Sequence, residues 1–470
     1  MDHDAKHKCG VFGVWGASDS ACQTYTALCA QQHRGQESAG IAVSDGRRLG
    51  AHVGMGLVVD VFCKEVLDRL RGKAAIGHNR YSTTGSSRPC NAQPLLEEYV
   101  GGQVAVAHNG NLINADLLRR DYEHRGHIFH TSTDTEVIIH LLATHHLTKD
   151  DPLVEALQHL QGAYSLVCLF ADRIEAVRDP WGWRPLVLGR TRDGHPCVAS
   201  ETVAFDAIGA RFTREVEPGE IVTLDDNGVR SRRFASGHTP AHCIFEHVYF
   251  ANPSSNLFGE NVQLVREKLG EKLAAEAPVD ADCVIPMPDS GRSAALGYAR
   301  ASGIPYREGI VLNRYVGRSF IQPTQKQRDD AVQLKFSMVG EIVCGKRLVV
   351  VDDSIVRGTT TRGKMKQLRR AGAKEIHLRI SCPPIRHPCY FGIDFPDPSQ
   401  LIAANRTVDQ TRHYLEIDSL HYLSLEGMLS CVSQPKDHYC TACWSGKYRL
   451  NVDRPVGKLD LERRQVKMFT

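Results

Sequence analysis

The sequence contains no apolar run approaching the roughly eighteen residues that a membrane-spanning helix needs. Its first eight residues, Met1 to Lys8, are polar throughout, whereas a secretory signal has a hydrophobic region at this place. These absences argue against a membrane protein and against a secreted one. We therefore expect a cytoplasmic protein that has no membrane partner.

A surplus of one charge sign is also missing. The 57 basic and 54 acidic residues give a formal net charge of +3, and the basic residues are scattered. Nucleic-acid-binding domains gather basic residues on one face, so we expect no nucleic-acid partner. A hydrophobic content of 42% and a charged content of 24% are typical of a globular protein. At 470 residues the chain is too long for one compact core, which predicts two domains.

Cysteine usage argues against a disulfide framework. The chain has fifteen cysteines, an odd number scattered along its whole length. In a cytoplasmic protein most of them are expected to be reduced residues without chemistry. We place in this group the six that follow Cys9 in the first half, namely Cys22, Cys29, Cys63, Cys90, Cys168 and Cys197.

The stretch from Arg347 to Gly363 has the pattern of an anion site. Leu348 to Val351 predicts a short buried strand of a parallel sheet. A pair of carboxylates, a loop of small and hydroxyl residues at 354–361, and a helix ending at Gly372 follow it. Backbone N–H groups and a helix N-terminus would then face a phosphate, while the carboxylates suit a ribose or a Mg²⁺ ion. The simpler interpretation is an ordinary strand-to-helix turn.

This stretch resembles the ribose-phosphate loop of type I phosphoribosyltransferases, in the form found in the purine pathway. The resemblance implies a phosphoribosyl pyrophosphate site formed by Asp352, Asp353, Ser354, Arg357, Gly358, Thr359 and Thr360. It also implies a Mg²⁺ ion held by Ser290, Asp352 and Asp353. Alternating helices and strands around these residues predict an α/β domain with a parallel sheet, liganded at the carboxyl ends of its strands.

Several motifs in the first half place polar residues at the end of a short predicted strand or in the loop after it, where binding groups usually lie. They are CGVFGVWG at 9–16, QHRGQESAGI at 32–41, IGHNRYSTTG at 76–85, VAVAHNGNL at 104–112 and TDTE at 133–136. Together they resemble the glutaminase domain of amidotransferases in the N-terminal-nucleophile hydrolase family. The resemblance implies an αββα sandwich over residues 9–237, joined by a short polar segment to the second domain at 241–470.

The glutaminase resemblance assigns roles residue by residue. The Cys9 thiol would attack the glutamine amide, with the α-amine of the same residue as its base. This requires removal of a leader, residues 1–8. Asn109 and Gly110 would stabilise the oxyanion, and Arg80 and Asp134 would bind the carboxylate and ammonium groups of glutamine. We expect Arg34 to be structural, and the bland interpretation of Cys9 is a buried strand cysteine.

The residues at 313–335, between two ligand-binding strand ends, are polar and cationic and contain Gly and Pro. They predict either a solvated loop or, as we prefer, a lid that closes over pyrophosphate. By resemblance, closure would form an internal passage for ammonia, with Tyr315 as the candidate gate. Trp181 and Trp183 are unusual for the family, and we expect them to affect specificity at most.

Cys440 and Cys443 form a C-x-x-C pair near the end of the chain. By spacing alone the pair fits zinc, a redox pair or an iron–sulfur site. Resemblance to the iron–sulfur branch of the family implies a [4Fe–4S] cluster on Cys243, Cys389, Cys440 and Cys443. The cluster would tie the C-terminal tail to the start of the second domain. Zinc at the same four thiolates is the alternative.

From residue 9 to about 450 the chain thus resembles the glutamine phosphoribosylpyrophosphate amidotransferases. The implied reaction converts glutamine and phosphoribosyl pyrophosphate to phosphoribosylamine, glutamate and pyrophosphate, the first step of purine synthesis. The family also implies purine nucleotide inhibitors and a homotetramer. Two alternatives are a phosphoribosyltransferase-like regulator, which would need no glutaminase half, and a sugar-phosphate isomerising amidotransferase, which would not use VVVDDSIVRGTT.

Overall fold

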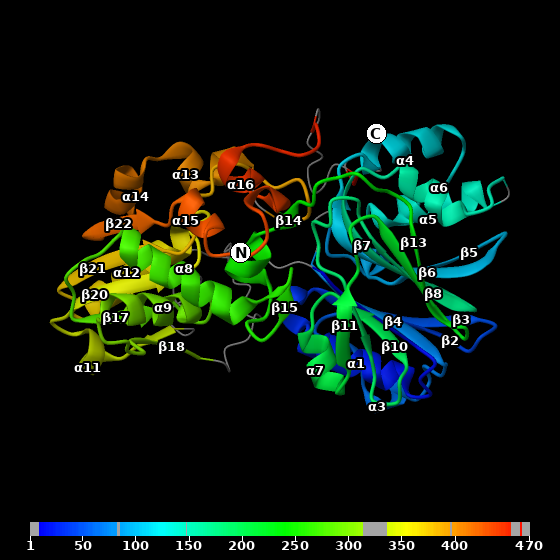
Figure 1. Ribbon diagram of the computed structural model, residues 1–470, viewed down its shortest axis with the longest axis horizontal. Helices are drawn as coiled ribbons and strands as arrows, with labels where there is room; N and C mark the ends of the chain where they lie inside the picture. Colours follow the sequence, from blue (N-terminus) through cyan, green and yellow to red (C-terminus); the bar gives the residue numbers. More distant parts are fainter. Residues whose placement is uncertain are drawn as a thin grey trace.

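The computed structural model describes residues 9–81, 85–146, 148–313, 336–394, 397–452 and 461–462. Two bodies lie side by side along its long axis (Figure 1). The first half of the chain forms two stacked antiparallel sheets with helices outside them, and the second half forms a parallel sheet with helices around it. The predicted αββα sandwich and the predicted parallel-sheet domain are both confirmed. Within these residues no helix is both long and apolar enough to cross a bilayer.

Strand β1 (Gly10–Trp15), the first strand of the described chain, lies in the middle of the first sheet. The order of this sheet is β11 (Arg211–Glu215), β9 (Val187–Arg190), β10 (Pro196–Ala199), β1, β4 (Ala74–Arg80), β2 (Ser38–Ser44) and β3 (Leu49–Met55). Helices α1 (Ser20–Ala30), α2 (Val58–Val61), α3 (Lys64–Leu67) and α7 (Val203–Ile208) belong to the outer layer at this sheet (Figure 1).

The second sheet of the sandwich packs its inner face on the first. Its order is β13 (Gly228–Arg233), β12 (Glu220–Asp225), β8 (Arg173–Arg178), β7 (Gly162–Phe170), β6 (Gly102–Leu112) and β5 (Leu95–Tyr99). Helices α4 (Ala115–His124), α5 (Thr135–His145) and α6 (Pro152–Gln158) cover its outer face (Figure 1). Val11, Ile76, Ala105 and Val167 meet in the core between the sheets, and all four are fully buried.

The parallel sheet of the second body has the order β17 (Cys283–Pro286), β20 (Arg347–Asp352), β21 (Glu375–Ile380) and β22 (Ser419–Tyr422). The two strands β17 and β20 are mainly apolar and buried, whereas β21 and β22 alternate apolar with polar residues. The helices are α8 (Val262–Glu276), α9 (Arg292–Ser302), α11 (Gly340–Val343), α12 (Thr359–Arg370), α13 (Ile402–Asn405), α14 (Val408–Leu415), α15 (Leu425–Leu429) and α16 (Ala442–Ser445).

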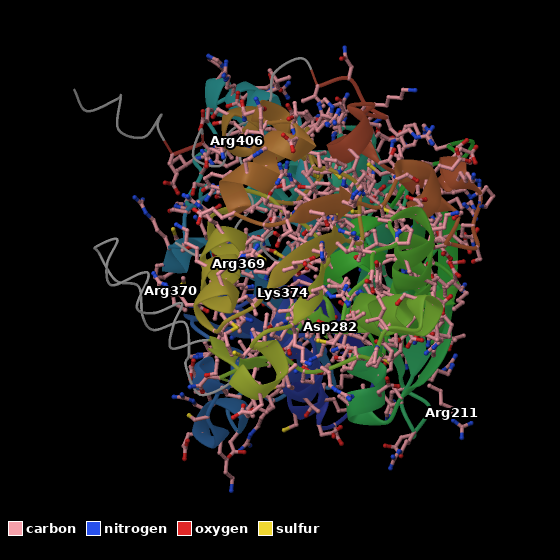
Figure 2. All side chains as sticks on the ribbon, turned by 90° about the vertical axis from the view of Figure 1, so that its left-hand side faces the viewer. Arg211, Asp282, Arg369, Arg370, Lys374 and Arg406 are labelled. Carbon is pink, nitrogen blue, oxygen red and sulfur yellow. The ribbon has the colours of Figure 1, made fainter. Side chains whose placement is uncertain are left out.

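Small two-stranded pairs complete the fold. They are β14 (His242–Cys243) with β23 (Tyr439–Cys440), β15 (Asn256–Leu257) with β16 (Glu260–Asn261), and β18 (Ile310–Leu312) with β19 (Phe336–Met338). The amino ends of the parallel strands face away from the sandwich: Figure 2 shows Asp282, just before β17, and Lys374, just before β21, on the outer side of the second body. The carboxyl ends, with Asp352, therefore point toward the sandwich.

Candidate active sites

Cys9 lies immediately before β1, and the pairing of Gly10 with Asn79 places it beside the end of β4. Its thiol is buried and donates to the carbonyl oxygen of Tyr81 at 3.4 Å. Burial raises the pKa of this thiol to about 11, although a backbone hydrogen bond at Tyr81 and the Arg80 charge oppose the rise. The thiol is therefore protonated at neutral pH and needs a base to become a nucleophile.

Two buried side chains of opposite charge, the Arg80 guanidinium and the Asp134 carboxylate, lie within electrostatic reach of Cys9. Arg80 ends β4, and its Nη1 donates to the carbonyl oxygen of Ser86 at 3.3 Å. Asp134 precedes α5 and accepts from the backbone N–H of Leu112 at 2.9 Å. Burial raises the pKa of Asp134, but nearby His108 and hydrogen bonds outweigh it, so the pKa is lowered and the carboxylate is ionised. Such a pair matches a zwitterionic amino acid.

Asn109 and Gly110 lie inside β6, where they pair with Ser165 and Tyr164. We predicted these residues at the end of a short strand or in the loop after it; they lie near the end of a strand that is longer than predicted, because it runs from Gly102 to Leu112. A Cβ at Gly110 would lie 1.9 Å from the carbonyl oxygen of Ala163, so only glycine fits. The Nδ2 atom of Asn109 is buried and has no hydrogen-bond partner among the described residues. It is a donor that can serve a substrate oxygen.

The C-terminal tail reaches this site, which the sequence did not predict. One carboxylate oxygen of Glu462 accepts from the backbone N–H of Ser86 at 2.6 Å and from the hydroxyl of Ser132 at 2.9 Å. The carbonyl oxygen of Ser86 also accepts a hydrogen bond from the Arg80 guanidinium, and Ser132 lies two residues before Asp134. A carboxylate of this same chain therefore sits next to the predicted glutamine-binding pair. No motif around Glu462 signals this contact.

The second site lies at the carboxyl end of β20. The Ser290 hydroxyl, in the loop between β17 and α9, donates to Asp352 at 3.5 Å, and the backbone N–H of Asp353 donates to the same carboxylate at 2.9 Å. Both carboxylates are buried. Buried Arg266 on α8 interacts electrostatically with Asp353: burial lowers the guanidinium pKa to about 10, while the charge of Asp353 opposes that effect. The structure thus brings together the three predicted magnesium ligands, which all offer oxygen atoms.

The loop after this carboxylate pair ends at Gly358, whose φ of +78° favours glycine. Helix α12 begins directly afterwards, at Thr359. The predicted loop of eight residues is therefore too long: Thr359 to Thr361 form the first turn of the helix. Their N–H groups are the unpaired donors of a helix start, which suits a phosphate. Arg357 adds a half-buried guanidinium whose pKa is lowered by burial.

Side-chain contacts join the two bodies, and Arg357 of the acceptor loop interacts electrostatically with Tyr81, beside Cys9. The hydroxyl of Tyr81, beside Cys9, donates to Asp394 at 3.2 Å, and Asn111 donates to the carbonyl oxygen of Tyr390 at 2.9 Å. Arg34 donates to the carbonyl oxygen of Cys9 at 3.0 Å and to Glu246 of the second body at 3.0 Å. Arg34 is thus a structural residue, as expected, and its partner Glu246 is one that the sequence did not indicate.

The four predicted cluster cysteines gather beside this boundary. Cys243 and Cys440 are direct partners in the parallel β14–β23 pair. Cys443 lies on α16, and its thiol interacts electrostatically with those of Cys389, Cys440 and Cys243. All four thiols are enclosed, and burial raises the pKa of each. Within the described ranges no three His, Cys, Asp or Glu side chains converge tightly enough to hold one ion.

Two sequence predictions lie outside the described residues. These are the leader at 1–8 and, apart from Asn313, the lid with its proposed gate Tyr315.

The sandwich with Cys9 and the parallel sheet with its carboxylate pair define a two-domain glutamine amidotransferase whose second domain has the phosphoribosyltransferase fold. A family profile described as a glutamine amidotransferase domain matches residues 78–207. An amidophosphoribosyltransferase of Methanothermobacter thermautotrophicus is 48% identical over 472 residues, covering 98% of this chain and 98% of the relative. One of Bacillus subtilis is 47% identical over 447 residues, covering 94% of each. The chain belongs to the amidophosphoribosyltransferase family.

Solved structures agree with this assignment along nearly the whole chain. The glutamine phosphoribosylpyrophosphate amidotransferase of B. subtilis, in complex with ADP and GMP, has a TM-score of 0.90 at 44% identity. The match covers 96% of this chain and 99% of that one. A structure described as the allosteric regulatory enzyme of purine biosynthesis matches with a TM-score of 0.91 at 45% identity, with the same coverage.

Proposed function

We propose that the protein takes the amide nitrogen of glutamine at the Cys9 site and transfers it, as ammonia, to phosphoribosyl pyrophosphate at the Asp352 site. The products are phosphoribosylamine, glutamate and pyrophosphate, in the first step of purine biosynthesis. The observation that carries this proposal is the closeness of the two sites: Arg357 of the acceptor loop interacts electrostatically with Tyr81, beside Cys9, and with Asp394, to which the Tyr81 hydroxyl donates. Ammonia handed over inside the protein avoids protonation by bulk water, which would remove its nucleophilicity.

At the donor site the Arg80 guanidinium would bind the substrate carboxylate and Asp134 its ammonium group. The Cys9 thiol then attacks the amide carbon, and its proton passes to the free α-amine that removal of residues 1–8 would create. The amide oxygen becomes an oxyanion, and the unpartnered Nδ2 of Asn109 is a preorganised donor for it together with the N–H of Gly110. Ammonia leaves, and water releases glutamate from the thioester.

At the acceptor site the start of α12, with Ser354, Arg357, Gly358, Thr359 and Thr360, would hold the 5′-phosphate. Asp352 and Asp353 would orient the ribose hydroxyls. The oxygen atoms of Ser290, Asp352 and Asp353 fit Mg²⁺, which neutralises the leaving pyrophosphate when bound. Ammonia then attacks C1 of the ribose and pyrophosphate departs. The lid at 313–335 would exclude water from this step.

A [4Fe–4S] cluster fits Cys243, Cys389, Cys440 and Cys443 better than zinc does. One zinc ion needs four sulfur atoms about 2.3 Å away, whereas a cluster binds each thiolate to a different iron and so spaces them more widely. The four thiols interact with each other without converging on one point. When bound, the cluster would hold the tail strand β23 against β14. We expect anaerobically purified protein to be coloured, and metal analysis to find four irons per chain and no zinc.

Regulation and assembly remain predictions from the family. The B. subtilis relative was solved with ADP and GMP, so we propose that purine nucleotides bind and inhibit this chain too. We also propose that the chain assembles as a homotetramer and acts in the cytoplasm.

The proposed reaction is tested by a balance of products. The anaerobically purified protein is given Mg²⁺, phosphoribosyl pyrophosphate and glutamine labelled with ¹⁵N in the amide group. We expect glutamate and pyrophosphate in equal amounts and ¹⁵N in phosphoribosylamine, even when unlabelled ammonium is present in excess. Label diluted to the level of the bulk ammonium would contradict internal transfer. Glutamate formation without pyrophosphate would contradict the reaction itself.

A further inference from the structure

Trp183 belongs to the glutaminase half but lies among the cluster cysteines. It follows β8 in a turn held by buried Asp179, whose carboxylate accepts from the backbone N–H groups of Trp181 at 2.9 Å and Trp183 at 3.4 Å. The Trp183 side chain is fully buried and shares an apolar cluster with Cys389 and Cys440. The sequence marked this residue as unusual for the family without assigning it a role.

Trp183 is linked to three of the four predicted ligands: to Cys243 through the backbone, to Cys389 through Phe391, and to Cys440 through its indole. Its carbonyl oxygen accepts from the backbone N–H of Cys243 at 3.1 Å. Its ring stacks on Phe391 with centroids 4.4 Å apart and an interplanar angle of 14°. The backbone N–H of Phe391 in turn donates to the Cys389 sulfur at 3.4 Å. The indole N–H interacts with the thiol of Cys440.

The indole nitrogen is the atom that points to a bound group. It is buried and, among the residues that the structure describes, has no partner that meets the geometry of a hydrogen bond. Leaving a buried donor unsatisfied costs about 1–3 kcal/mol. A neutral thiol is a weak acceptor, whereas a thiolate bound to iron carries negative charge and accepts strongly. The donor is therefore matched to the ligated form of Cys440.

Arg184, which follows Trp183 in the sequence, adds a positive charge near the same cysteines. The Arg184 side chain is buried, its Nη2 donates to the carbonyl oxygen of Phe391, and its charge lies within electrostatic reach of Cys243 and Cys389. Its Nη1 lies 3.7 Å from Glu246, so its charge is only partly balanced. A cluster on four thiolates carries net negative charge. A buried cation beside it offsets part of the cost of burial.

We propose that Trp183 is a positioning residue for the cluster and donates its indole N–H to the iron-bound thiolate of Cys440. This inference rests on the cluster proposed above. Hydrogen bonds to ligand sulfur withdraw electron density from it, which slightly weakens the iron–sulfur bond and makes the cluster harder to oxidise. The glutaminase half thereby sets the oxygen resistance of a cofactor whose four ligands all come from the other half.

The test compares wild type with Trp183→Phe, which keeps a stacking ring and removes the N–H, and with Trp181→Phe as the matched control. Trp181 lies in the same turn and packs against the same apolar cluster, with its ring centroid 5.7 Å from that of Trp183, but among the described residues its indole makes no hydrogen bond to a cysteine. Resonance Raman spectra and the rate of bleaching of the cluster colour in air are recorded. We expect higher iron–thiolate stretching frequencies and bleaching several-fold faster in Trp183→Phe, with Trp181→Phe like wild type.

Two outcomes separate this inference from the proposal beneath it. A colourless wild type without iron would overturn the cluster itself. A wild type with four irons and a Trp183→Phe variant with unchanged Raman bands and bleaching rate would overturn only the role of Trp183. If Trp183→Phe does not fold, benzothienylalanine placed at position 183 keeps the shape of the indole and still lacks the N–H. The same two readouts then decide, and equal changes in Trp181→Phe would also count against the inference.

Discussion

Arg34 and Glu246 form a fully buried ion pair that joins the two halves of the protein, with 3.0 Å between Nη2 and Oε1. The same guanidinium holds the carbonyl oxygen of Cys9 and also bonds Glu201. Both carboxylates keep Arg34 charged: although burial lowers its pKa, their charges raise it above the ordinary value. Glu246 of the acceptor half thus helps to position Cys9 indirectly, through Arg34.

This pair predicts a large loss of stability when one partner is removed. Glu246→Ala leaves the Arg34 charge buried, and we expect a cost of about 3–5 kcal/mol in the free energy of unfolding. The control is Glu426→Ala, which removes an exposed partner of Lys436 and should cost less than about 1 kcal/mol. Denaturant titration measures both. Equal, small losses would contradict the account of this interface.

The buried thiol predicts how Cys9 reacts in the chain that still carries residues 1–8. Its pKa, raised by burial to about 11, leaves it protonated through the neutral range. Thiolate content, and hence the rate of alkylation by iodoacetamide, should rise about tenfold per pH unit from pH 7 to pH 10. Mass spectrometry of the Cys9 peptide follows the rate. A plateau beginning below pH 8 would contradict a thiol with a raised pKa.

The carboxylate pair predicts a separable defect. Asp352→Asn should lower pyrophosphate release by about 10²-fold or more, because one charged oxygen group of the proposed metal and ribose site is lost. Slow hydrolysis of glutamine alone should be retained. The matched control is Asp280→Asn, at an exposed carboxylate that binds Arg347 near the opposite ends of the strands. If Asp280→Asn is equally impaired, the assignment of the site is wrong.

The tail contact predicts an effect on glutamine binding. Glu462→Ala releases the N–H of Ser86 and the hydroxyl of Ser132, beside Arg80 and Asp134. A charge-assisted hydrogen bond contributes about 1.5–3 kcal/mol, so the KM for glutamine should fall by about tenfold or more with kcat little changed. Glutaminase kinetics measure this. A KM that stays the same or rises would show that the tail does not compete with the substrate.

The strands and the identity of both sites were predictable from the sequence because local pattern and chemistry agree there. Leu348 to Val351 could only be a buried strand, and two carboxylates after it belong at its carboxyl edge. The start of α12 was misplaced by a few residues, because threonines in a loop and at a helix N-terminus look alike in sequence. Strand β6 was expected to be short because its polar residues, among them Asn109, break the usual alternation.

Contacts between distant segments could not be predicted. Glu246, Trp183 and Glu462 lie in stretches without a motif, and each acquires its role from a partner more than a hundred residues away. Glu246 meets Arg34, Trp183 meets Cys440, and Glu462 meets Ser132. Such pairs depend on how the two halves pack, which composition and periodicity do not encode.

The account rests on two sites that work in series, and Cys9→Ala tests this most directly. The variant and wild type are each given Mg²⁺ and phosphoribosyl pyrophosphate with either glutamine or ammonium at high pH, and pyrophosphate release is measured. We predict that Cys9→Ala loses the glutamine-driven reaction and keeps the ammonium-driven one at close to the wild-type rate. Loss of both reactions, or retention of the glutamine-driven one, would contradict the account.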